Sequence, residues 1–256
     1  MTRQLTLTGL NDFPTEFGNT SIAELIIHNA RSISFQIQDG DIFIITQKII
    51  SKSENRLRDL RKVTPTEEAL QLAMITGKRA ELLQLILEES QEVLRARNNL
   101  IIVKHKLGFV CANAGIDHSN SIADDEESDF VLLLPENPDR SAEEIRTEIE
   151  KKTGKRIGVL IIDSHGRAWR NGTVGACIGT SGVPGIVDLR GQEDLFGYKL
   201  KATQVAAADE LAAAASLLMG QAAEGIPCII ARGFPYALRE SSLSELIRET
   251  KNDLFQ

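Results

Sequence analysis

The stretch LGFVCANAGIDHSN, from Leu107 to Asn120, is where the chain changes most sharply from an apolar segment to a polar one. Its first residues have the order of a strand, and Ala-Asn-Ala-Gly then breaks that strand. The break predicts that Asp117 and Asn120 lie on a loop beyond a buried edge. A carboxylate there can bind a hard cation, and an amide can donate to a phosphate or base oxygen. An ordinary turn with a solvated aspartate is the alternative.

A second stretch repeats this design. Arg156 to Asp163, RIGVLIID, is a fully apolar strand that ends in Asp163 and Ser164. The next residues, His165-Gly166-Arg167, are predicted to form a turn. Two aspartates at the ends of two buried strands indicate a pair of ligands for a divalent metal.

Two lysines follow a third apolar strand, which is DIFIIT from Asp41 to Thr46. Lys48 and Lys52 belong to the stretch QKIISK, which starts at Gln47 directly after that strand. Lysines at this separation share one helical face, and at a strand end they can converge on one phosphate chain. A solvated basic turn is the alternative.

Composition restricts the classes of protein that the chain can belong to. With 256 residues, of which 42% are hydrophobic, it can bury a large core in one or two compact domains. The net charge of -7 argues against a nucleic-acid-binding face. Because the overall charge is negative, an anionic substrate would have to be bound by a local cluster of lysines or by metal ions. No apolar run is long enough to span a membrane and no signal core opens the chain, which predicts a cytoplasmic protein. The three cysteines are widely spaced and predicted to be buried and unpaired: Cys111, Cys177 and Cys228.

Helical and strand patterns alternate along the chain. Predicted helices cover 21–31, a segment capped by Thr64 with Glu67, 78–98, a segment from Ser141 to Lys152, 203–223 and 242–251. Predicted strands cover 2–10, 100–104, 130–134 and 226–232. The acidic run from Asp124 to Asp129 is interpreted as a solvated loop, with a metal-binding loop as the alternative. The sequence contains no repeat and no linker. Residues 1–256 are therefore predicted to form one mixed α/β unit, with a division into two interleaved subdomains as the alternative.

Residues 172–185, GTVGACIGTSGVPG, contain five glycines in fourteen positions. The stretch matches neither the P-loop pattern nor the dinucleotide-binding pattern. Either the bare backbone approaches a ligand, or the glycines let two elements pack closely.

Taken together, four motifs resemble the coenzyme F420 gamma-glutamyl ligase family. They are TQKIISK from Thr46, VCANAGID from Val110, DSHGR from Asp163 and MGQ from Met219, and the similarity extends from Gly40 to about Tyr236. The family adds L-glutamate to the deazaflavin precursor F420-0 using GTP. The resemblance implies interleaved mixed sheets with packed helices, an intertwined homodimer, and the stand-alone form without a nitroreductase-like domain.

The resemblance also implies a set of site residues. Asp117 and Asp163 would bind one divalent ion, Mg²⁺ or Mn²⁺, with Ser164 beside a second and K⁺ as a further candidate. Gln47, Lys48 and Lys52 would hold the GTP phosphates, and Asn120 would also contact the nucleotide. A further wall of the nucleotide site would be formed by Met219, Gly220, Gln221, Ala222, Ala223, Glu224, Gly225 and Ile226.

Two departures from the family pattern affect this assignment. Members often carry a glutamate at the position of Gln221, as a ligand of the second metal. A glutamine keeps a carbonyl oxygen but removes a negative charge, so the second metal site is expected to be weaker. The loop from Asn11 to Gly18 is longer than the family segment, which leaves the nucleotide contacts there unassigned.

The residue types independently suit amide formation from a carboxylate, which requires an acyl phosphate. Asp117, Asp163, Lys48 and Lys52 are the predicted catalytic residues, because cations held by the two aspartates and the two lysines would together neutralise charge on the phosphates. Neither His118 nor His165 can be assigned as a general base. Two alternatives stay open: the same chemistry on another acceptor, such as a folate-like compound, and a nucleotide-binding module without turnover.

Overall fold

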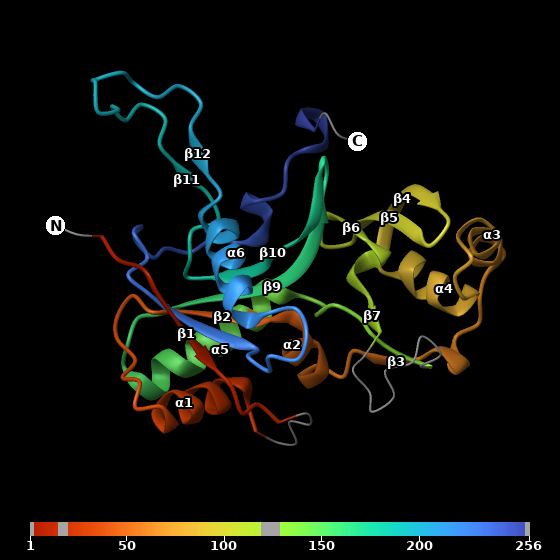
Figure 1. Cartoon of the computed structure of the whole chain (residues 1–256), viewed down its shortest axis with the longest axis horizontal. Coiled ribbons are helices and arrows are strands. Elements are labelled where there is room, and N and C mark those ends of the chain that lie inside the picture. Colours follow the sequence, from red (N-terminus) through yellow and green to blue (C-terminus); the bar gives the residue numbers. More distant parts are fainter. Residues whose placement is uncertain (1–2, 15–19, 119–128, 254–256) are drawn as a thin grey trace. The chain divides into compact units, whose positions relative to one another are not determined.

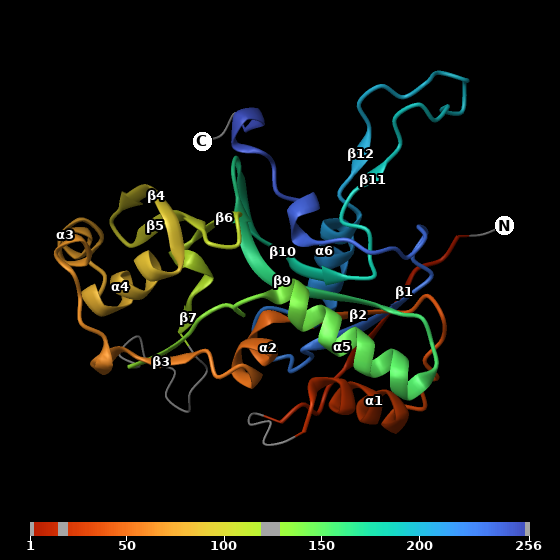
Figure 2. The ribbon, with the colours of Figure 1, turned by 180° about the vertical axis from the view of Figure 1, so that it is seen from behind.

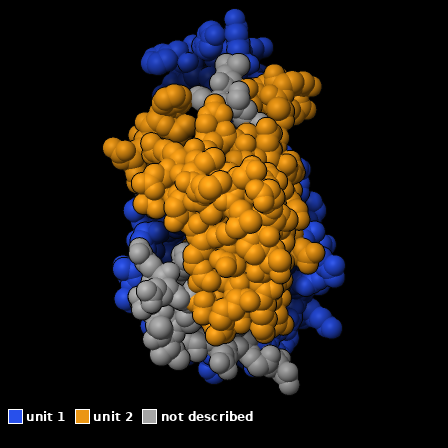
Figure 3. Space-filling view, turned by 90° about the vertical axis from the view of Figure 1, so that its right-hand side faces the viewer, with its two compact units in different colours: residues 1–49, 137–164, 174–246 blue, residues 50–136, 165–173, 247–256 orange. Residues whose placement is uncertain are grey.

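The computed structural model describes residues 3–14, 20–118 and 129–253. The chain has the predicted mixed α/β fold, with several sheets and packed helices. It divides into two compact units built from discontinuous segments (Figure 3). Unit 1 consists of Met1–Ile49, Asn137–Ser164 and Val174–Leu246, and unit 2 of Ile50–Glu136, His165–Thr173 and Ile247–Gln256.

Unit 1 is organised around a five-stranded sheet. Its strand order is β1 (Thr6–Leu10), β13 (Cys228–Arg232), β2 (Ile42–Thr46), β9 (Gly158–Arg167) and β10 (Arg170–Ser181). The inner strands are apolar runs because they are buried on both faces. β2 pairs antiparallel with β13 and parallel with β9, so β2 and β9 end at the same edge of the sheet.

Helices cover both faces of this sheet. α6 (Ala207–Met219) packs against alternate residues of β2, including Ile42 and Ile44. The helices α1 (Ile22–Ser32) and α5 (Pro138–Thr153) lie side by side on the opposite face (Figure 2), and Lys152 Nζ is 2.6 Å from Glu24 Oε1.

The glycines of β10 let these helices approach closely. A Cβ added at Gly175 would lie 2.5 Å from the carbonyl oxygen of Ala212 in α6. One added at Gly179 would lie 2.4 Å from Cβ of Pro138, at the start of α5. The sequence left two explanations for these glycines, approach to a ligand or close packing of two elements. Close packing explains the glycine at these two positions.

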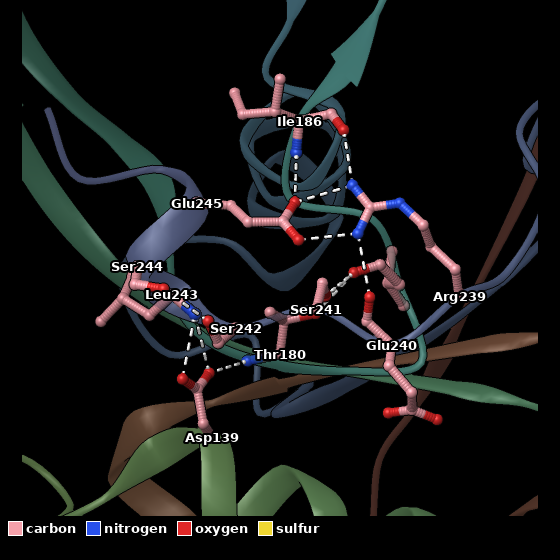
Figure 4. A network of polar contacts seen from close by, with 11 residues as sticks. Asp139, Thr180, Ile186, Arg239, Glu240, Ser241, Ser242, Leu243, Ser244 and Glu245 are labelled. Atoms are coloured by element: carbon pink, nitrogen blue, oxygen red, sulfur yellow. Dashed lines mark hydrogen bonds and ion pairs between the residues drawn. The ribbon is translucent and has the colours of Figure 1, made fainter.

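Polar contacts fix the segment after β13 to the end of β10 (Figure 4). The Asp139 carboxylate accepts N–H groups from Thr180 at 2.8 Å and Leu243 at 2.9 Å, and burial raises the pKa of this carboxyl. Arg239 donates to Glu245 at 2.7 Å, which lowers the pKa of the Glu245 carboxyl. The predicted terminal helix is wrong, since only the 3₁₀ turns Leu243–Glu245 and Thr250–Asn252 form between residues 242 and 253.

A hairpin arm extends from unit 1 through β11 (Val187–Asp188) and β12 (Gln204–Val205) (Figure 1). Its tip carries Leu195 and Phe196, which are 98% and 94% exposed.

Unit 2 contains two three-stranded sheets. One has the order β3 (Leu57–Asp59), β8 (Phe130–Leu132), β7 (Asp117–His118), and the other has the order β4 (Ser90–Arg97), β5 (Leu100–His105), β6 (Val110–Ala112). The helices α3 (Glu67–Thr76) and α4 (Ala80–Glu88) supply the apolar residues Ala69, Leu82, Leu83 and Ile86 to a core shared with both sheets. The remaining helix, α2 (Gln47–Ser53), starts in unit 1 and continues into unit 2.

Several predicted boundaries are wrong. The helix predicted for 78–98 is a helix, α4, followed by a strand, β4, because the backbone after Glu89 bonds to β5 across a turn at Asn99, whose φ is +59°. The cap of α3 is Thr66 and not Thr64, and α5 starts at Pro138 with Asn137 as its cap and not at Ser141. Finally, His165-Gly166-Arg167 is not a turn, since β9 continues to Arg167.

Candidate functional site

Three stretches that are far apart in the sequence meet at the carboxyl edge of β2 and β9. The parallel register pairs Thr46 with Ile162, so Gln47 and Asp163 are the next residues at the same edge. The Thr46 N–H donates to the carbonyl of Pro227 at 2.9 Å, which brings in the segment before β13. The carboxyl ends of parallel strands are where open α/β sheets bind ligands.

The first stretch is α2, which begins at Gln47 with no loop after β2. Gln47 and Ser51 are fully buried, and Lys48 and Lys52 are partly exposed one turn apart. The prediction that the two lysines share a helical face is therefore confirmed. Their contact with phosphates stays a prediction.

The second stretch is the end of β9, where Asp163 is half-buried and Ser164 exposed. Ser164 Oγ donates to Gln221 Oε1 at 2.9 Å, and Gln221 Nε2 donates to Ser216 Oγ at 3.1 Å. Ser216 thus fixes the orientation of the amide, so that its carbonyl oxygen faces Ser164. The sequence prediction missed Ser216, although it is the only hydroxyl in the alanine-rich run of α6.

These side chains offer oxygen atoms of three kinds: carboxylate, hydroxyl and amide carbonyl. Mg²⁺ and Mn²⁺ prefer such a donor set, so Asp163, Ser164 and Gln221 fit a hard divalent cation. Within the described ranges, no group of three or more His, Cys, Asp or Glu side chains could hold a metal ion. A cation at this edge would therefore depend on the neutral oxygens of Ser164 and Gln221 as well as on carboxylates.

The third stretch, the predicted nucleotide wall, starts where α6 ends at Met219. Gly220 has a φ of +74°, and a Cβ there would lie 2.1 Å from Cδ of Glu224. The Glu224 carboxylate bends back and accepts the N–H of Ala222 at 2.8 Å, while the side chain of Ile226 packs over Gly9 of β1. Glu224 and Ile226 therefore hold the shape of the loop, and a nucleotide contact by Ala223, Gly225 or their neighbours stays a prediction.

Asp117 lies in unit 2, on β7, opposite Leu132 of β8. The turn before it, Asn113–Gly115, has three successive residues with φ between +52° and +65°, although Ala114 has a side chain. A Cβ at Gly115 would lie 2.6 Å from Leu134, so the turn is packed tightly where β7 begins. The pairing of Asp117 with Asp163 around a cation stays a prediction, and Asn120 lies outside the described residues.

The two histidines beside the aspartates belong to unit 2. His118 pairs with Val131 in the sheet. The ring centroid of His165 is 5.0 Å from that of Phe109, which in turn stacks on His105 at 5.2 Å. His165 therefore belongs to a packed group of rings, and neither histidine is assigned as a base.

The three cysteines are buried and form no disulfide within the described part of the chain, as predicted. Burial raises the pKa of the Cys177 and Cys228 thiols, which keeps them protonated and unreactive. No helix in the described part of the chain is both long and apolar enough to cross a membrane.

Comparison with known proteins gives consistent matches over most of the chain. Residues 18–233 match the family model described as F420-0:Gamma-glutamyl ligase. The chain is 47% identical over 222 residues to the coenzyme F420:L-glutamate ligase of Methanocaldococcus jannaschii, covering 87% of each chain. It is 44% identical over 247 residues to the enzyme of that name from Methanococcus maripaludis, covering 96% of this chain and 95% of the relative. A relative of the same name from Methanothermobacter thermautotrophicus is 42% identical over 254 residues, or 98% and 99% of the two chains.

Proposed function

The chain belongs to the F420-0:gamma-glutamyl ligase family, and from this premise we propose that it joins L-glutamate to coenzyme F420-0, and then further glutamates, through γ-glutamyl amide bonds. GTP and a divalent metal ion would drive the reaction. The carboxyl edge of β2 and β9 carries the proposal, because it gathers Lys48, Asp163 and Gln221 from three separate stretches.

The chemistry requires two transfers. A carboxylate oxygen of the acceptor attacks the γ-phosphorus of GTP, and the bond to GDP breaks, which leaves an acyl phosphate. The glutamate amine then attacks the acyl carbon, loses a proton and expels phosphate, so that the amide forms. Both steps need the phosphate chain held in line and its negative charge neutralised.

The residues of this chain would divide that work. Lys48 and Lys52 supply positive charge to the phosphates from α2. Asp163, Ser164 and Gln221 would hold divalent cations, and the family resemblance implies Asp117 as a further ligand. A bound cation supplies further charge neutralisation at the transferred phosphoryl group.

We also propose that the enzyme works as a cytoplasmic homodimer. The hairpin arm supports this assembly, since the almost fully exposed Leu195 and Phe196 at its tip are apolar. Light scattering of the purified chain measures the assembly directly, and a monomer at assay concentration would contradict the proposal.

A direct test uses the purified chain with GTP, Mn²⁺, L-glutamate and F420-0. The expected result is GDP release and a mass increase of F420-0 by whole glutamate units. GDP release with a different acceptor alone would support the variant chemistry, and GTP binding without turnover on any acceptor would support a binding module. Asp117→Asn should abolish metal-dependent turnover with the thermal midpoint unchanged, and normal turnover in this variant would contradict the site.

A further inference from the structure

Unit 2 contains a groove that the site described above does not use. Its volume is about 530 Å³, within the roughly 300–1,000 Å³ of ligand-binding clefts. The apolar part of its wall comes from Leu57, Val63, Leu85 and Phe130. An aromatic ring beside aliphatic side chains is suited to a flat, largely apolar heterocycle.

The positive charge of the groove is concentrated on the side of β3. The Arg58 guanidinium donates to the carbonyls of Asn55 and Leu57, each at 3.0 Å, and has no carboxylate partner among the described residues. The neighbouring Asp59 is already bonded to Arg61 through both oxygens at 2.9 Å. The other cation lining the groove, Lys62, has its Nζ 4.0 Å from Asp59 Oδ2, so Arg58 is the lining cation without a carboxylate partner among the described residues, and its charge stays available to an anion.

The opposite rim carries one negative charge, on Glu88 near the end of α4. Its Oε1 accepts a hydrogen bond from the amide of Gln84 at 2.9 Å, which leaves its charge in place. An anionic ligand is thus attracted to the β3 side of the groove and repelled from the α4 side.

The sheet connects this groove to Asp117. Leu132 of β8 pairs with Leu57 on one side and with Asp117 on the other. Two strand spacings separate Leu57 from Asp117, which is about 10 Å. A ligand seated beside Leu57 therefore needs only a short extended chain to bring a carboxyl group to Asp117.

We propose that this groove binds the acceptor, with the planar deazaflavin ring against Phe130 and Leu57 and the phosphodiester at Arg58. The proposal rests on the proposed function for the identity of the acceptor. It assigns acceptor recognition to unit 2, separate from the side chains at the carboxyl edge of β2 and β9 in unit 1.

The test measures binding and not turnover, so that it is independent of the ligase assay. The anisotropy of deazaflavin fluorescence is titrated with protein for two probes: F420-0, and the same ring and ribityl chain without the phosphodiester. Leu57→Ser should weaken both probes. Arg58→Gln should weaken F420-0 by about tenfold, the size of one charged hydrogen bond, and leave the uncharged probe unchanged. Glu88→Gln should tighten F420-0 alone.

Matched control variants lie elsewhere in unit 2. Leu70, on α3, is 47% exposed against 45% for Leu57, and the Arg95 guanidinium likewise donates to a backbone carbonyl, that of Leu94. Leu70→Ser and Arg95→Gln should bind both probes as the wild type does.

The possible outcomes separate the two proposals. Wild-type affinity of Leu57→Ser and Arg58→Gln for F420-0 would overturn the groove while leaving the ligase function intact, and so would an absence of probe binding to the wild type. Weakened binding in these variants, with no glutamate addition by the wild type, would support the groove and contradict the ligase function.

Discussion

The two ends of β2 differ in how their polar groups are held. At the amino end, Asp41 is fully buried and accepts two hydrogen bonds of 2.7 Å from Arg232, whose guanidinium lies 4.4 Å from the ring centroid of Phe35. At the carboxyl end, neutral groups bond one another, as Ser164 does with Gln221. A buried carboxylate matched by a guanidinium maintains the fold, whereas neutral oxygens at strand ends can turn toward a cation or a phosphate.

The largest expected effect is on catalysis, from Asp163→Asn at the carboxyl end. Removing a carboxylate ligand of the proposed divalent cation should lower kcat by roughly 10²–10³-fold. The free energy of unfolding should change little, because Asp163 is only half-buried at the end of β9. GDP release measures the first quantity and urea unfolding the second. A lower free energy of unfolding with unchanged kcat would show that Asp163 maintains the fold and does not take part in the reaction.

The amino end should respond in the reverse way to Asp41→Asn. Arg232 would lose its carboxylate partner, and breaking a buried ion pair costs about 3–5 kcal/mol. A loss of about 3 kcal/mol is expected, since the Arg232 side chain keeps 35% of its exposure to water.

Urea unfolding measures this loss, and kcat should be unchanged wherever the variant is folded. Glu144→Gln is the control, because it removes a largely exposed partner of Arg140 and should leave the unfolding midpoint in place. An equal shift in both variants would contradict a special role for Asp41.

The contrast between local and long-range information explains what the sequence could predict. The strand from Asp41 to Thr46 and the lysines after it were found because an apolar run and a helical spacing are local patterns. The approach of Pro227 to Thr46 and the bond from Gln221 to Ser216 depend on strand register and on a helix end, which no local pattern encodes. Val93 shows the same limit, since it continues the apolar stripe of a helix but pairs with Val103 in a sheet.

A smaller effect should reach the carboxyl end of β2 indirectly, through packing. A Cβ at Gly175 would lie 2.6 Å from Cβ of Ser216, the residue that orients Gln221. Gly175→Ala should therefore cost about 1–3 kcal/mol of stability and also lower kcat, because α6 must shift.

Gly166→Ala is its matched control, since no atom lies within 4 Å of the Cβ that it would add. Calorimetry and GDP release are measured on both variants. A loss of stability in Gly175→Ala with wild-type kcat would show that the position of Ser216 does not matter for the reaction.

The smallest expected effect lies away from both ends, at the Arg239–Glu245 pair (Figure 4). Arg239 lowers the pKa of the Glu245 carboxyl below its ordinary 4.5, so the ionised form stabilises the folded chain. Glu245→Gln should cost about 0.5 kcal/mol at neutral pH, a small value because the pair is partly solvated. Since protonation removes the same interaction from the wild type, this difference should persist above pH 4.5 and vanish as the pH falls through the lowered pKa. Thermal midpoints of the two proteins at several pH values measure it, with Glu249→Gln as the exposed control. A difference that grows toward acid pH would mean that the Glu245 carboxylate destabilises the fold.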